Sequence, residues 1–159
     1  MRNTEDVAVF CVGKAPYNPQ LFAKPACNVR PLTPRTKSTN NYGAHGLDVH
    51  KCPPDKSMPA TVLKFNNVQG GFHPTQKPVA LFEYLIRTYT DEGMTVLDNT
   101  AGSGTTAIAA ENAGRNWICI ERDPEYAAKA IDRIQRHVGE VVDRPPLSLQ
   151  QRFNIMLIL

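Results

Sequence analysis

The stretch of this sequence whose residue types are best suited to hold a ligand is a short apolar run followed by a loop of small residues. It reads VLDNTAGSGTT and covers residues 96–106. Asp98 ends the apolar run, the place where open α/β sheets bind ligands, and Gly102 and Gly104 let a ligand approach the backbone closely. The loop also offers hydroxyl groups at a helix N-terminus, on Ser103, Thr105 and Thr106.

The residue types in this loop make some classes of ligand less suitable than others. A nucleoside triphosphate loop needs a lysine after its second glycine, and the AGSGTT segment has none. A dinucleotide loop has the form Gly-x-Gly-x-x-Gly, and here Ala107 takes the third place, which is tolerated but makes the signal weak. Glu121 follows 23 residues after Asp98, at the end of a second apolar run, where an acid accepts both hydroxyls of a ribose.

Recognition of a ribose by Glu121 and of an ammonium group by Asp98, with little provision for phosphate, fits S-adenosylmethionine. Each acid alone could equally be a strand-end residue that caps a loop. The two acids together with the glycine loop favour the ligand, so the sequence predicts an S-adenosylmethionine site between two strand ends.

Apolar periodicity places this loop in an alternating series of helices and strands. The sequence predicts helices over 78–89, 105–114 and 124–138, and strands over 94–98 and 116–121. Strand, helix, strand, helix at this spacing is a βαβ unit, so an α/β fold with a parallel sheet covered by helices is expected. Earlier in the chain, DVAVFCV at 6–12 is predicted to be a buried strand and ATVLKF at 60–65 a short one.

Length and composition limit the class of protein. The 159 residues, 42% of them hydrophobic, suit one domain with a modest core. There is no apolar stretch of the roughly 18 residues that a membrane helix needs, and no secretory signal, so a cytoplasmic location without a membrane partner is expected. The cysteines stand far apart, and the spacing of His45, His50 and Cys52 fits no standard metal site, so no metal is expected.

Positive charge is concentrated in one part of the sequence. Residues 24–77 hold eight basic and two acidic side chains, whereas the remainder holds ten basic and thirteen acidic ones. A basic stretch on a mildly acidic body suits a polyanion such as nucleic acid, although a solvated lysine-rich loop would have the same composition. The residues that could neutralise phosphates are Lys24, Arg30, Arg35, Lys37, Lys51, Lys56 and Lys64, and those that could read base edges are Arg35, Asn40 and Asn41.

Three segments resemble the DNA methyltransferases that modify the exocyclic amines of adenine (N6) or cytosine (N4). They are HPTQKPVALFEYLI at 73–86, VLDNTAGSGTTAIAA at 96–110 and WICIERDPEYAAKAIDRI at 117–134. The resemblance is to the permuted order, in which the cofactor-binding half follows the catalytic half. It implies a Rossmann-like S-adenosylmethionine-dependent methyltransferase fold, three-layered with a mostly parallel sheet and incomplete in this chain. It also implies S-adenosylmethionine as cofactor, double-stranded DNA as partner and a place in restriction–modification.

The resemblance further implies a set of cofactor-binding residues. Pro74, Thr75 and Lys77 would line the methionine end, Asp98, Gly102, Ser103, Gly104 and Thr105 would form the cofactor loop, and Glu121 would bind the ribose. A lysine at a helix N-terminus is repelled by the positive end of the helix dipole, and a ligand carboxylate beside Lys77 would offset that repulsion. Alternatively, Lys77 could be a solvated side chain that needs no ligand. His73 is expected to pack or to hydrogen-bond rather than to act as a base.

The motif with which this family holds its target amine is missing from the sequence. That motif reads Asp/Asn/Ser-Pro-Pro-aromatic, and its aromatic ring stacks on the base that is turned out of the duplex. The Pro-Pro pairs here, in CPPD at 52–55 and RPPL at 144–147, have neither an acceptor before them nor an aromatic residue after them. In the permuted order the motif would lie before Met1, so the chain resembles a C-terminal part whose catalytic residues are unknown.

These observations divide the chain into four parts. Residues 1–23 would be a strand and turn of the catalytic half, 24–71 an irregular basic loop for target recognition, 72–138 the S-adenosylmethionine-binding βαβ part, and 139–159 a tail of unassigned role. The apolar end of that tail could dock on the sheet as an edge strand. Alternatively, its residues could be foreign to the natural protein, for example from a shifted reading frame.

A methyltransferase of small molecules or RNA would share the cofactor loop but would leave the basic stretch unexplained. Two other functions follow from this division of the chain. The first is site-specific transfer of a methyl group from S-adenosylmethionine to an exocyclic amine in DNA. The alternative is a catalytically silent cofactor- and DNA-binding fragment, either a relic or one that another chain completes. A homodimer or a complementing chain is the expected assembly.

Overall fold

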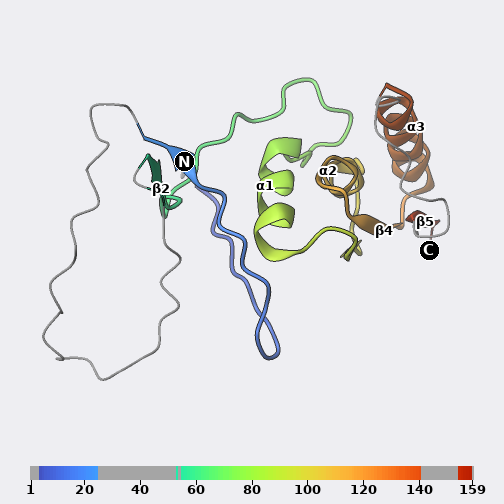
Figure 1. The fold of residues 1–159 in the computed structure, drawn as a ribbon. Coiled ribbons are helices and arrows are strands. Elements are labelled where there is room, and N and C mark those ends of the chain that lie inside the picture. Colours follow the sequence, from blue (N-terminus) through green and yellow to red (C-terminus); the bar gives the residue numbers. More distant parts are fainter. Residues whose placement is uncertain (1–3, 25–52, 54, 141–153, 159) are drawn as a thin grey trace, which may run out of the picture. The chain divides into compact units, whose positions relative to one another are not determined.

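The computed structural model describes residues 4–24, 53, 55–140 and 154–158 of the chain (Figure 1). The chain forms two compact units, one of Met1–Asn18 with Lys64–Leu159 and one of Pro19–Leu63. The smaller unit contains two short antiparallel strands, β1 (Phe22–Ala23) and β2 (Lys56–Ser57). The residues that line the candidate site belong to the larger unit.

The larger unit is built on a parallel sheet in the order β3, β4, β5. Its strands are β3 (Thr95–Asp98), β4 (Asn116–Glu121) and β5 (Asn154–Ile158). α1 (Val79–Tyr89) precedes β3, α2 (Thr105–Ala113) connects β3 to β4, and α3 (Pro124–Glu140) follows β4. The predicted βαβ unit is confirmed, because each of its elements lies within two residues of the predicted bounds.

Local chemistry explains where the helices begin and end. The Asp123 carboxylate accepts hydrogen bonds from the backbone N–H groups of Glu125 (2.8 Å) and Tyr126 (3.2 Å), which caps the N-terminus of α3. Gly114 ends α2 in the left-handed conformation, at φ +71°. Pro78 directly precedes α1, where its missing N–H costs nothing. These capping residues are the ones that the sequence predicts.

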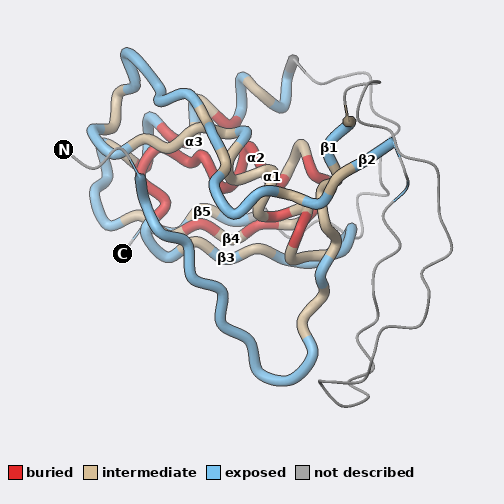
Figure 2. Tube along the Cα trace, turned by 90° about the vertical axis from the view of Figure 1, so that its left-hand side faces the viewer, coloured by how far each residue is buried: buried red, intermediate tan, exposed pale blue. Residues whose placement is uncertain are grey.

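α2 and α3 cover one face of the parallel sheet, and α1 packs beside α2 (Figure 1, Figure 2). Trp117 and Cys119 are buried beneath α2, whose alanines allow the helix to approach the strands closely. On the opposite face Leu97, Ile155 and Leu157 are exposed, at 63%, 40% and 43%. The described residues therefore form two of the three layers that the resemblance implies, which agrees with the expectation of an incomplete fold.

Two predicted strands are wrong. Residues 6–12, expected as a buried strand, run as irregular chain with exposed side chains, Phe10 at 92% and Val12 at 105% relative exposure. Residues 60–65 contain no strand either. A β-branched segment becomes a strand where a neighbour pairs with it and an apolar layer covers it. Among the described residues, none pairs with 6–12 as a strand.

The apolar end of the chain docks as an edge strand, which is one of the two outcomes that the sequence leaves open. β5 pairs in parallel with β4, and Met156 lies opposite Cys119 and packs against the core. Met156 is the one half-buried side chain among residues 155–158, so pairing with β4 covers little of this apolar segment.

Other expectations fall on parts of the chain that the structure describes only partly. His45, His50 and Cys52 lie outside the described residues, as does most of the basic segment 24–71. Over the described ranges, no group of three or more metal-binding side chains comes together. No helix in those ranges has both the length and the apolar character that crossing a bilayer requires.

Candidate functional site

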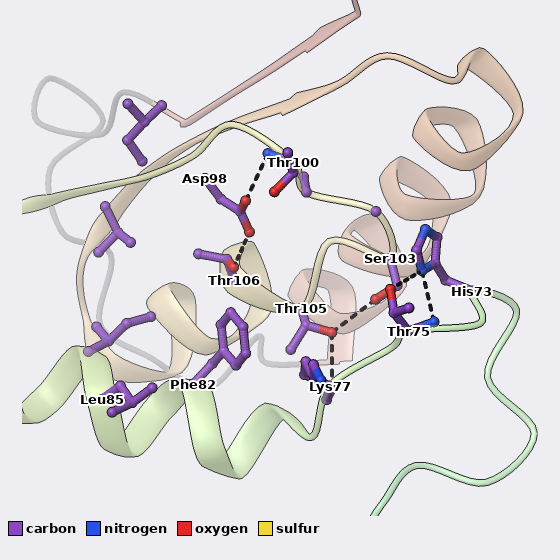
Figure 3. Close-up of a pocket in the computed structure, with 15 residues that line it drawn as sticks. His73, Thr75, Lys77, Phe82, Leu85, Asp98, Thr100, Ser103, Thr105 and Thr106 are labelled. Carbon is purple, nitrogen blue, oxygen red and sulfur yellow. Dashed lines mark hydrogen bonds between the residues drawn. The ribbon is translucent and has the colours of Figure 1, made fainter. Parts of the chain in front are cut away.

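A cavity of about 450 Å³ opens at the carboxyl end of β3 (Figure 3). One wall is the loop between β3 and α2, and another is the segment that leads into α1. Phe82, Leu85 and Ile86 of α1 add an apolar side. The remaining lining residues are His73, Thr75, Lys77, Val96, Leu97, Asp98, Thr100, Ala101, Gly102, Ser103, Thr105 and Thr106. The cavity thus combines an apolar wall with polar groups at a strand end, as ligand sites in α/β folds do.

The loop itself can turn this tightly because two of its residues are glycines. Gly102 and Gly104 adopt left-handed conformations, with φ of +51° and +71°. Space is restricted as well: a Cβ on Gly102 would lie 3.1 Å from His73 Nε2, and one on Gly104 would lie 3.0 Å from Ile134 Cδ1. Both positions therefore favour glycine, because the positive φ suits it and because an added Cβ would force His73 or Ile134 to shift.

Asp98 braces one side of this loop. Its Oδ1 accepts a hydrogen bond from the Thr100 backbone N–H (3.0 Å), and its Oδ2 accepts one from the Thr106 hydroxyl (2.5 Å). A carboxylate has about four acceptor positions, so these bonds leave about two for another partner. Because Asp98 lines the cavity, it remains suited to a cationic group there.

Glu121 braces the other side of the loop. Its Oε2 accepts a hydrogen bond from the Gly102 backbone N–H (2.6 Å), and its Oε1 accepts one from the Asp123 N–H (3.0 Å). Asp98 pairs with Cys119, two residues before Glu121, so both acidic side chains point to the same face of the sheet. Glu121 stands beside the loop rather than among the residues that line the cavity.

The hydrogen bonds to Glu121 favour its charged form. The backbone N–H of Asp123 contributes most to lowering the pKa of the Glu121 carboxyl, burial opposes this, and the Gly102 N–H lowers the pKa further. The carboxylate is therefore held ionised and fixed in place at neutral pH.

The segment before α1 forms the facing wall. His73 packs edge-on against Tyr126, with ring centroids 4.4 Å apart, and its Nδ1 accepts a hydrogen bond from the Thr75 N–H (3.3 Å). This is the packing and hydrogen-bonding role that the sequence predicts. Thr75 and Lys77 line the cavity, whereas Pro74 is exposed and lies outside the lining.

Lys77 has a partner that the sequence did not predict. Its Nζ donates to both carboxylate oxygens of Glu5, at 2.7 Å each. The lysine is therefore neither an isolated solvated side chain nor dependent on a ligand carboxylate. Glu5 lies 72 residues earlier in the chain, and no local sequence pattern connects the two.

A second residue missed from the sequence, Arg133, supports the loop from α3. Its Nη1 donates to the Ser103 carbonyl oxygen (2.8 Å) and to the Thr105 hydroxyl (3.1 Å). Burial lowers the pKa of its guanidinium. The sequence holds one clue, because Arg133 directly precedes Ile134 on the buried stripe of α3, where a basic residue needs a partner.

Taken together, the fold and the site define a class of protein. A parallel α/β unit presents two strand-end acids, a left-handed glycine turn and an adjoining cavity, which is an arrangement that binds nucleoside-type cofactors. The sequence of residues 8–132 matches the N6_N4_Mtase family of DNA methylases. The chain belongs to this family, so the family resemblance is confirmed, while the permuted order of its halves stays a prediction.

Several named relatives share the central part of the chain. M2.DpnII, a type II methyltransferase of Streptococcus pneumoniae, is 45% identical over 65 residues, which is 41% of this chain and 24% of that protein. The putative methylase YubD of Escherichia coli K12 is 41% identical over 73 residues, covering 46% of this chain and 32% of that protein. The chain thus matches about a quarter to a third of the length of these relatives.

Solved structures show similarity over parts of the chain. The crystal structure of an M1.HpyAVI–SAM complex matches at 42% identity and a TM-score of 0.42, over 46% of this chain and 36% of that one. PvuII DNA methyltransferase, described as cytosine-N4-specific, matches at 26% identity and a TM-score of 0.42, over 64% and 40%. At these TM-scores neither structure defines the fold of this chain.

The lowered pKa of Glu121 leads to a prediction about stability and pH. Because the pKa in the folded protein lies below the ordinary value of 4.5, the carboxylate stabilises the fold above pH 4.5. This contribution is lost as the pH falls through the lowered pKa. We expect Glu121→Gln to reduce the free energy of unfolding at pH 7 by about 1 kcal/mol or less, given solvent screening, and the difference from wild type to vanish in acid.

Urea unfolding of both proteins between pH 7 and pH 3 measures this difference. Asp6→Asn, at an exposed position outside the helices and strands, is the control. A Glu121→Gln effect that stays constant over the whole pH range would show that the carboxylate charge does not brace the loop.

Proposed function

We propose that the cavity at the end of β3 binds S-adenosylmethionine. The observation that carries this proposal is the pair of strand-end carboxylates, Asp98 and Glu121, which hold a glycine turn between them and keep acceptor positions free. A volume of about 450 Å³ suits a ligand of nucleoside size. The loop has no lysine for a triphosphate, which favours a cofactor without phosphate groups.

The residues of the site suit the parts of this cofactor. Glu121 would accept hydrogen bonds from the ribose hydroxyls, and Asp98 would attract the ammonium group of the methionine end. Ser103, Thr105 and the backbone of Gly102 would contact the cofactor along the loop. Thr75 and Lys77 would bound the methionine end from the facing wall. The exposed position of Pro74 supports a role in shaping that segment rather than contact with the ligand.

We further propose that the protein acts as part of a DNA methylase directed at an exocyclic amine of adenine or cytosine, within restriction–modification and in the cytoplasm. The bound cofactor would supply a methyl group activated by its positive sulfur. The chain's own residues would hold that cofactor, exclude water with the apolar wall of α1, and position the DNA. The family match and the type II methyltransferases among the relatives support this reaction class.

Cofactor binding is tested by replacing the proposed ribose-binding acid. Calorimetry should give a measurable heat with S-adenosylmethionine, and Glu121→Ala should weaken binding about 10–100-fold, because charged hydrogen bonds to the ribose are lost. Asp132→Ala, which removes an exposed carboxylate on α3, is the control and should bind as wild type does. Absence of heat with a folded wild-type protein would contradict the proposal.

Double-stranded DNA is the proposed partner of the basic segment 24–71. The exposed Lys56 and Lys64 are described residues of that segment, and most of its other basic residues lie outside the described part. Gel shifts on duplex DNA should weaken with salt, with a log–log slope of about −0.9 for each phosphate neutralised. Lys64→Gln should make the slope shallower by about 0.9, because one phosphate fewer is neutralised. Absence of a salt-dependent shift on duplex DNA would instead favour a methyltransferase of small molecules or RNA.

A catalytically silent binding protein is the second candidate function, and the missing Pro-Pro-aromatic motif favours it. Holding an amine in line with the methyl group is worth about 7–11 kcal/mol at best, and most of that is lost without a group to hold the amine. We therefore expect the 159-residue chain to incorporate little or no labelled methyl into unmethylated DNA. Robust incorporation by the purified chain would refute the silent function and reveal another way of holding the base.

A further inference from the structure

Arg133 holds the back of the cofactor loop although it does not line the cavity. Besides its bonds to Ser103 and Thr105, it stands between two α3 residues that pack on the loop. A Cβ on Gly104 would lie 3.2 Å from the Ala130 Cβ and 3.0 Å from Ile134 Cδ1. One face of α3 thus fixes the consecutive loop residues 103–105 by close packing and by hydrogen bonds.

Thr105 passes this constraint to the facing wall of the cavity (Figure 3). Its hydroxyl donates to the Lys77 carbonyl oxygen at 3.3 Å and lies 3.0 Å from the Ser103 hydroxyl. A hydroxyl can accept from Arg133 and Ser103 while it donates to Lys77, so its capacity for hydrogen bonds is fully used. Ser103 and Thr105 are each 4% exposed, so water cannot readily replace a lost partner.

The charge of Arg133 is not balanced by a carboxylate among the described residues. Holding a half-buried cation beside neutral acceptors, near the positive end of the α2 dipole, costs free energy. An uncharged side chain of similar length would pack there without that cost. The guanidinium has one property that an apolar side chain of this length lacks, because the two hydrogens of its Nη1 can bond to a backbone carbonyl and to a hydroxyl at the same time.

We propose that Arg133 and Thr105 form a clamp that sets the spacing between the glycine loop and residues 73–77, and thereby the fit of the amino-acid end of the cofactor. Arg133 is a positioning residue in this clamp and makes no contact with the cofactor. The inference rests on the proposed function, since it takes the cavity between these two walls to receive S-adenosylmethionine. Its consequence is selective: the amino-acid end depends on the clamp, whereas the nucleoside end depends on Glu121.

Two ligands separate these ends. S-adenosylmethionine carries the amino-acid group, and 5′-methylthioadenosine is a nucleoside without it. By calorimetry on the full chain, Arg133→Met should bind S-adenosylmethionine about tenfold more weakly, because bonds from a charged donor are lost, and 5′-methylthioadenosine as wild type does. Arg136→Met is the matched control, since Arg136 lies one turn along α3 and pairs with the exposed Asp132. It should bind both ligands normally.

Conservative and combined variants test whether the clamp acts as a unit. Arg133→Lys should recover part of the lost affinity, because an ammonium group restores at least one of the two bonds. Thr105→Val removes the hydroxyl and keeps the shape of the side chain. If the two residues act together, Arg133→Met combined with Thr105→Val should weaken binding no more than the stronger single variant. Circular dichroism at the assay temperature verifies that each variant is folded. If Arg133→Met does not fold, the affinities of Arg133→Lys for the two ligands are compared with those of the wild type instead.

The outcomes distinguish the clamp from the cofactor site itself. Three results would overturn the clamp while leaving the proposed function in place. They are an equal loss of affinity for both ligands in Arg133→Met, no loss of affinity for either ligand, and additive losses of affinity in the double variant. A folded wild-type protein that binds neither ligand would contradict the proposed function instead.

Discussion

The turn between β3 and α2 depends on two carboxylates that satisfy its backbone N–H groups. Asp98 binds the N–H of Thr100, and Glu121 binds the N–H of Gly102, so the tight left-handed turn does not leave these donors without partners. Parallel strands bring their carboxyl ends to the same edge of a sheet, which is why acids at the ends of β3 and β4 can reach one loop. The acids that fold this loop are therefore also the acids beside the cavity.

The neighbouring elements each restrict the position of this loop from a different side. α3 packs on Gly104 and bonds to Ser103 and Thr105, while the segment before α1 contacts Gly102 through the ring of His73. The cavity is what remains between these supports and the apolar wall of α1. Because its polar groups are held by hydrogen bonds before any ligand binds, little ordering is left to oppose binding.

The sequence predicted the elements and residues that are determined by short-range patterns. The helices, the caps at Asp123 and Gly114, and the positions of the two glycines in the loop follow from sequence patterns only a few residues long. The errors and omissions depend on distant partners. A strand at 6–12 needs a neighbouring strand that its own composition cannot supply. The ion pair of Lys77 with Glu5 spans 72 residues, and the bond of Arg133 to Ser103 spans 30.

The most direct measurement is a crystal structure of the chain with S-adenosylhomocysteine, which keeps the nucleoside and the amino acid of the cofactor. The ribose hydroxyls should lie within hydrogen-bonding distance of the Glu121 carboxylate, with the amino group facing Asp98. Gly102 and Gly104 should keep their positive φ angles. A nucleoside bound elsewhere, or one held in this cavity while Glu121 points into solvent, would contradict the assignment.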